Sequence, residues 1–66
     1  MKSQEKHKFK AGDVIFYKYG FEAYYFLIIK IEKYCYEYFV LSTFKKVSYG
    51  KHAIEKNSVL IKSYER

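Results

Sequence analysis

Side chains that could bind a metal ion or attack a substrate are few in this sequence and lie far apart. His7 and His52 have no CxxC or HExxH companion, whereas a metal site needs several ligands at characteristic spacing. Cys35 is distant in sequence from both histidines, and nucleophilic catalysis needs a base held beside the nucleophile. Glu32 and Glu37 flank a predicted hairpin, and we interpret them as exposed charges at the strand ends and not as a catalytic pair. We therefore predict a non-enzyme with no catalytic residue, no metal or cofactor site and no small-molecule substrate.

The single cysteine also bears on the location of the chain. One cysteine cannot form an internal disulfide, which is typical of the reducing cytoplasm, and Cys35 is expected to pack as a small apolar side chain. The longest apolar run, residues 23–29, is shorter than the roughly 20 residues of a membrane-spanning helix. The charged start of the sequence lacks the apolar core of a signal peptide. These features predict a cytoplasmic protein without a membrane partner.

Basic residues outnumber acidic ones, which favours a polyanionic partner. Thirteen Lys and Arg residues against seven Asp and Glu residues give a net charge of +6, and such a field attracts nucleic acid. Small β-domains bind single strands with a positive groove and aromatic platforms, at about 1–3 kcal/mol for each stacked base. Nearly all the basic residues are lysine, which argues against base-specific reading. The residues predicted for this nucleic-acid-binding alternative are Lys18, Lys30, Phe44, Lys45, Lys46, Tyr49 and Lys51.

Aromatic residues make up 23% of the chain, with nine tyrosines, and they favour a protein partner. Tyrosine is enriched among the residues that dominate protein interfaces, although most aromatic side chains of so short a chain belong in its core. We expect an apolar set on one face of the longest predicted strand, with two aromatic residues before it, to bind a protein partner or a second copy. This set is Tyr24, Phe26, Ile28, Tyr19 and Phe21.

The elements that position these side chains are predicted to be strands. Sixty-six residues, half of them hydrophobic, suffice for one folded domain. Runs of β-branched and aromatic residues between turn residues predict five strands, and a more polar stretch predicts one helical turn. The predicted strands are residues 14–17, 24–33, 36–43, 47–49 and 59–61, and the helical turn is residues 54–58. Residues 1–8 are predicted to form a solvated basic arm, and residues 9–66 the domain.

Apolar residues occupy both faces of the longest predicted strand. Its two-residue alternation separates two sets of side chains. The set predicted to face the core is Tyr25, Leu27, Ile29 and Ile31. The opposite set is Tyr24, Phe26, Ile28, Lys30 and Glu32. Because the second set is polar only at its far end, its aromatic part must be covered by another element or form an exposed apolar surface.

Three segments carry a resemblance to a known fold. They are an entry of the form aromatic-x-x-Gly-Asp-Val at residues 9–14, the long strand 25–31 and the closing segment 54–61. This order resembles the SH3-like small β-barrels, a group that includes Tudor and KOW-type domains. The resemblance implies an all-β fold, namely a small five-stranded SH3-like antiparallel barrel with one short helical turn. It implies no ligand, because the sequence lacks the tryptophan and acidic loop of an SH3 groove and the hairpin glycine of a KOW motif.

Together these features predict a small non-enzymatic module that binds or inhibits another protein through a tyrosine-rich sheet face. Binding of single-stranded DNA or RNA is the alternative. Lys, Tyr, Phe and Ile make up half of the sequence, and AT-rich codons encode all four. A short chain of this composition is typical of phage or mobile-element accessory proteins, which commonly inhibit a host protein. So small a domain also gains stability from self-association, so a homodimer belongs to the expectation.

Overall fold

The computed structural model describes residues 7–64, which form five β-strands and one short α-helix. The elements are β1 (Asp13–Tyr19), β2 (Glu22–Ile31), β3 (Cys35–Val40), β4 (Lys45–Gly50), α1 (Lys51–Asn57) and β5 (Ser58–Ser63). All neighbouring strands pair antiparallel. The predicted mainly β fold is confirmed for these residues, and the helix begins at Lys51, ahead of the predicted start at Ile54.

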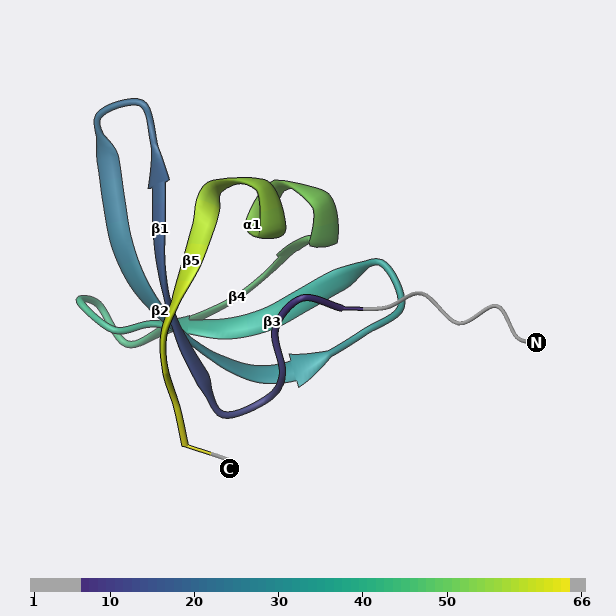
Figure 1. Cartoon of the computed structure of the whole chain (residues 1–66). Coiled ribbons are helices and arrows are strands. Elements are labelled where there is room, and N and C mark those ends of the chain that lie inside the picture. Colours follow the sequence, from purple (N-terminus) through teal and green to yellow (C-terminus); the bar gives the residue numbers. More distant parts are fainter. Residues whose placement is uncertain (1–6, 65–66) are drawn as a thin grey trace.

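The strands of residues 7–64 form one sheet in the order β4-β3-β2-β1-β5. Strands β4 and β5 are its edges and do not pair with each other, so the described sheet is open and the predicted closed barrel is not seen. In Figure 1, β1 and β5 run nearly upright while β3 and β4 run across them, so the sheet bends strongly. Helix α1 links the two edge strands along the chain.

The β1–β2 hairpin protrudes at the upper left of Figure 1. Tyr19 pairs with Glu22, which leaves Gly20 and Phe21 as a two-residue turn. Gly20 has a φ of 62°, a conformation that glycine adopts without a steric penalty. The turn therefore holds Phe21 and the strand ends on either side of it at the tip of a protruding hairpin.

One face of the sheet carries the core, and we call it the inner face. Residues directly opposite each other on paired strands share a face, and the register defines the set. The inner face comprises Ile15, Tyr17, Tyr24, Phe26, Ile28, Tyr36, Tyr38, Val40, Val47 and Tyr49. Phe26 and Ile28 are only 3% and 1% exposed, whereas Tyr25 is 51% exposed. The prediction that the set beginning with Tyr25 faces the core is therefore wrong.

A β-bulge explains this error. The register of β2 against β3 shifts between Ile28, which pairs with Tyr38, and Lys30, which pairs with Glu37. The extra residue, Ile29, reverses the alternation after it, because one inserted residue turns every later side chain to the other face. Ile31 therefore joins the core cluster on the inner face. A regular two-residue alternation without the bulge places Ile31 on the same face as Tyr25. With Ile31 added, that face looks the more apolar of the two.

The N-terminal segment and α1 cover one end of the inner face. Phe9 and Ile54 are buried in the core cluster with Tyr36. His7 packs edge-on against the Tyr36 ring at 5.1 Å, and its Nε2 atom donates to the Glu32 carbonyl oxygen at 2.6 Å. His7 thus contacts the body of the domain, although it was predicted to belong to a solvated arm. Residues 1–6 of that arm lie outside the described residues.

Candidate functional site

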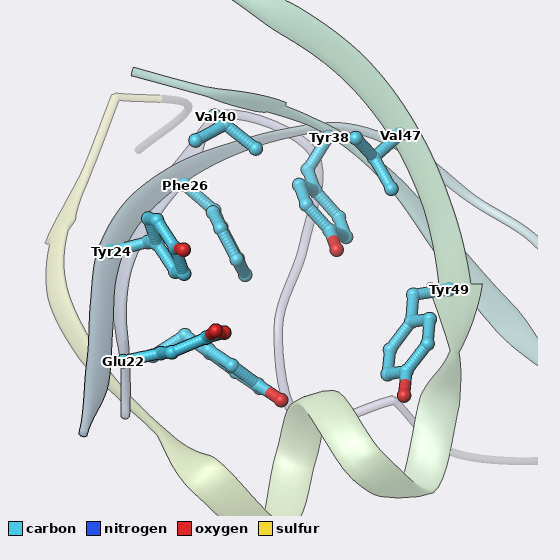
Figure 2. A pocket seen from close by; sticks show the side chains of 8 residues that line it. Glu22, Tyr24, Phe26, Tyr38, Val40, Val47 and Tyr49 are labelled. Carbon is cyan, nitrogen blue, oxygen red and sulfur yellow. The ribbon is translucent and has the colours of Figure 1, made fainter. Parts of the chain in front are cut away.

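At its other end, near the β1–β2 hairpin, the inner face lines a pocket of about 300 Å³. The lining residues are Tyr17, Glu22, Tyr24, Phe26, Tyr38, Val40, Val47 and Tyr49. They come from four adjacent strands, and Figure 2 shows that the labelled side chains point toward a common space. Because the residues stand on paired strands rather than on loops, the register of the sheet fixes their positions.

Phe26 forms the centre of the pocket floor. Its ring stacks on the Tyr38 ring with 4.0 Å between centroids. It also stacks on the rings of Tyr17 at 5.2 Å and Tyr24 at 6.1 Å. A set of four packed rings buries a large apolar area and leaves little freedom for any of them. The floor is therefore a preformed aromatic surface.

Tyr49 forms the opposite wall. It lies on edge strand β4, and Figure 2 shows it across the pocket from Tyr24. About half of its surface is exposed, so a ligand can reach its ring. Val40 and Val47 complete the lining with apolar side chains. The pocket thus combines an apolar interior with tyrosine rings at its mouth.

The electrostatics of the pocket disfavour additional negative charge. Burial raises the pKa of the Tyr38 hydroxyl to about 12, and the nearby hydroxyls of Tyr17 and Tyr49 contribute to the same shift. Burial also raises the pKa of Tyr17, with further contributions from Tyr49, Tyr19 and Glu22. These phenols therefore stay neutral, and Glu22 supplies the charge in the lining.

Glu22 differs from the other glutamates of residues 7–64, because each of the others has a lysine partner. The pairs are Lys30 with Glu32 at 3.7 Å, Lys46 with Glu37 at 3.2 Å and Lys51 with Glu55 at 3.9 Å. Within the described part of the chain, no lysine or arginine lies within ion-pair distance of Glu22. The pocket thus holds a carboxylate without a cationic partner from residues 7–64, in a chain whose net charge is +6.

The structure divides the residues predicted to bind a protein partner. Tyr24 and Phe26 line the pocket, but Phe26 is accessible only through it. Ile28 is buried in the core and lies outside the pocket lining, so it is not available to a partner in this fold. Tyr19 and Phe21 are exposed at the hairpin. The fold therefore removes Ile28 from the predicted binding surface.

Sequence reasoning missed most of the remaining pocket residues. They are Tyr17, Glu22, Tyr38, Val40 and Val47. Tyr38 and Val40 alternate correctly along β3 and could have been assigned to one face. Which side chains of the other strands lie beside them, however, depends on the strand register, and periodicity alone does not give the register.

The residues predicted for nucleic-acid binding are dispersed. Lys51 is buried and lies near Glu55, while Lys30 and Lys46 pair with carboxylates. Phe44 is exposed in the β3–β4 turn, and Tyr49 belongs to the pocket wall. Lys18 lies on β1 and Lys45 at the start of β4, on strands that do not pair. The structure does not gather this set into one groove.

Other chemically active side chains form no obvious site in the described residues. Cys35 is a half-buried free thiol that donates to a carboxylate oxygen of Glu32 at 3.2 Å. No three His, Cys, Asp or Glu side chains of residues 7–64 gather so as to hold a metal ion. None of the helices in this range is long and apolar enough to cross a membrane.

Comparisons with known proteins add no relative. No protein-family model matches the chain, and neither a curated protein nor a solved structure does. The pocket of the inner face therefore stands as the candidate functional site on its geometry alone.

Proposed function

We propose that this chain is a small binding module that takes one side chain of a protein partner into the pocket between Tyr17, Tyr24 and Tyr49. The observation that carries the proposal is the preformed, tyrosine-lined concavity of about 300 Å³ on the inner face. Ligand sites run from about 300 to 1,000 Å³, so this one suits a single large side chain better than a cofactor. Its apolar floor supplies binding energy, and its few polar groups supply orientation.

Exposed aromatic residues beside the pocket extend the proposed contact surface. Tyr19 pairs with Glu22 across the hairpin, and Phe21 is fully exposed in the turn between them. Large aromatic side chains with a free face are typical anchors of protein interfaces. A partner that inserts a side chain into the pocket would therefore also contact the hairpin tip.

We also propose that the domain belongs to the SH3-like small barrels. The support is the order of the elements, in which β1 to β4 pair consecutively, and β5 returns beside β1 after a short helix. Assignment to a phage or mobile element, inhibition of the partner and homodimer formation stay predictions from composition and size.

Partner capture with matched tyrosine variants tests the pocket. Tyr49→Ser removes an exposed pocket wall, and Tyr34→Ser removes an exposed tyrosine outside the pocket lining. Both variants should keep the wild-type circular dichroism spectrum. Proteins that bind the wild type and Tyr34→Ser but not Tyr49→Ser would be pocket ligands. Identical capture by all three proteins, or capture lost only with Tyr34→Ser, would contradict the proposal.

Nucleic-acid binding is the second candidate, supported by the net charge of +6 and by the exposure of Lys18 and Lys45. It predicts retention of single-stranded DNA or RNA at low salt, with an affinity that falls steeply as salt rises. Lys18→Gln and Lys45→Gln would each weaken that retention. An absence of retention at low salt would remove this candidate.

A further inference from the structure

We propose that the unpaired edge of β5 binds a short extended segment of a protein partner, apolar in its middle and acidic at its ends, as an added strand of the sheet. This inference goes beyond the proposed function, because no pocket residue belongs to β5. Three features of β5 carry it: its unpaired backbone, its exposed apolar side chains and the lysines near its two ends.

The unpaired backbone of β5 is the first feature. Among residues 7–64, β5 pairs with β1 on one side and with no strand on the other. The N–H and C=O groups on the outer side of an edge strand form a template for pairing with another extended chain. The register against β1 shifts between Leu60 and Lys62, so Ile61 forms a bulge. The regular part of the edge is therefore short and suits a segment of a few residues.

The side chains of β5 are the second feature. Val59, Leu60 and Ile61 follow one another along the strand, and about half of each is exposed. Val59 and Leu60 point to opposite faces of the sheet, because neighbouring residues of a strand alternate. An added strand with apolar side chains would therefore cover exposed apolar groups on both faces and gain binding energy from each.

The other edge of the described sheet carries a protection that β5 lacks. Strand β4 begins with Lys45 and Lys46, and lysines on an edge strand discourage pairing with another chain. Proline, which also blocks pairing, is absent from the whole sequence. Strand β5 has no charged residue before Lys62. Of the two edges, β5 is therefore the one suited to accept a strand.

The lysines near β5 select the occupant. Lys56 lies in the last turn of α1, just before β5, Lys62 lies near the end of β5, and both are exposed. No carboxylate of residues 7–64 forms an ion pair with either, and residues 56–64 contain no Asp or Glu. A second copy paired antiparallel would bring its lysine-bearing ends to these ends, and like charges side by side are destabilising. Acidic residues at the ends of a partner segment complement the charge instead.

An NMR titration of the isotope-labelled intact chain with a synthetic peptide tests the edge. The peptide is acetyl-Glu-Val-Thr-Val-Thr-Val-Glu-amide. One control peptide has every Val and Thr nitrogen methylated, and the other has Lys in place of both Glu residues. We expect the first peptide to shift the backbone amide resonances of Val59, Leu60 and Ile61 and to slow their hydrogen exchange. It should bind about fivefold or more tightly than either control.

Three results would overturn the proposal. Equal binding of the methylated control would show that backbone pairing is not used, and equal binding of the lysine control would show that the charges do not select the segment. An absence of shifts in β5 at millimolar peptide would exclude the edge as a binding site. Shifts in β5 that grow with protein concentration alone would assign the edge to a second copy, which also contradicts the proposal.

Matched variants place the binding on β5. Val59→Lys puts a charge in the middle of the unpaired edge and should weaken peptide binding about tenfold, whereas Ser48→Lys on β4 should leave it unchanged. Lys62→Gln should weaken binding about threefold, and Lys33→Gln, between β2 and β3, should not. Equal effects within either pair would contradict the assignment to β5. Tyr49→Ser should bind the peptide like the wild type, so failure of the edge and failure of the pocket are distinguishable.

Discussion

Two tyrosines on β3, Tyr36 and Tyr38, mark the two ends of the inner face. Both point to the same side of the sheet, and they are 0% and 5% exposed. The Tyr36 hydroxyl donates to Glu55 Oε2 at 2.5 Å and accepts from the Phe9 N–H at 3.2 Å. The Tyr38 hydroxyl has no hydrogen-bond partner within residues 7–64, and its side chain lines the pocket.

Coverage, and not residue type, makes these two ends different. Phe9 and α1 pack over the Tyr36 end, which we call the sealed end. Over the Tyr38 end, which we call the open end, the described residues leave a pocket. The same alternation of tyrosines along one strand therefore serves stability at one end and offers a binding surface at the other.

Truncating one apolar side chain at each end should give the largest difference between the two ends in the free energy of unfolding. Ile54→Ala at the sealed end removes a fully buried side chain and should lower the free energy of unfolding by about 3 kcal/mol. Val47→Ala at the open end removes a partly exposed one and should lower it by less than about 1 kcal/mol. Urea unfolding followed by circular dichroism measures both values. Equal losses would mean that the two ends are packed alike.

Removing the Tyr36 and Tyr38 hydroxyls one at a time should give a smaller difference between the two ends in the free energy of unfolding. Tyr36→Phe leaves the Glu55 carboxylate and the Phe9 N–H without this partner, and it should reduce the free energy of unfolding by about 2 kcal/mol. Tyr38→Phe removes a hydroxyl without a partner among residues 7–64, and its effect should stay below about 0.5 kcal/mol. The same unfolding assay compares them. A larger loss from Tyr38→Phe would reverse the assignment of the ends.

The sealed end should also weaken in acid. Burial alone would raise the pKa of Glu55, but hydrogen bonds from the Lys8 N–H and the Tyr36 hydroxyl, with the charges of Lys51 and His7, lower it below 4.5. A carboxyl with a lowered folded-state pKa stabilises the fold at higher pH, and this contribution is lost as pH falls through the folded-state pKa.

Thermal unfolding from about pH 6 to about pH 3 checks this sign. The melting temperature of the wild type should fall across this range, and its advantage over Glu55→Gln should shrink below pH 4.5. An advantage that stayed constant or grew toward low pH would contradict the assignment of Glu55 to the sealed end's hydrogen-bond network.

The strands could be predicted from the sequence because β-branched and aromatic runs, broken at Gly20 and again after Val40, leave few alternatives. Which face of β2 is buried could not be predicted, because both faces are apolar and the bulge at Ile29 has no sequence signal of its own. Choosing the wrong face assigned Phe26 and Ile28 to a docking surface, although both belong to the core.

The pocket was harder to predict than the fold. Its residues lie on four strands, and their meeting depends on the pairing of Tyr17 with Tyr24, of Phe26 with Val40 and of Tyr38 with Val47. Such pairings depend on the register of each hairpin, and composition carries no information about that register. The lysine surplus did not point to the pocket either, because no lysine lines it.

Solvent access to individual tyrosine rings tests the central claim most directly. Aromatic NMR spectra recorded with increasing amounts of a soluble nitroxide measure how closely the probe approaches each ring. We predict strong broadening of Tyr49, weaker but clear broadening of Tyr24, and none of Tyr36. Broadening of Tyr36 equal to that of Tyr49, or protection of Tyr24 and Tyr49 equal to that of Tyr36, would contradict a face that is sealed at one end and open at the other.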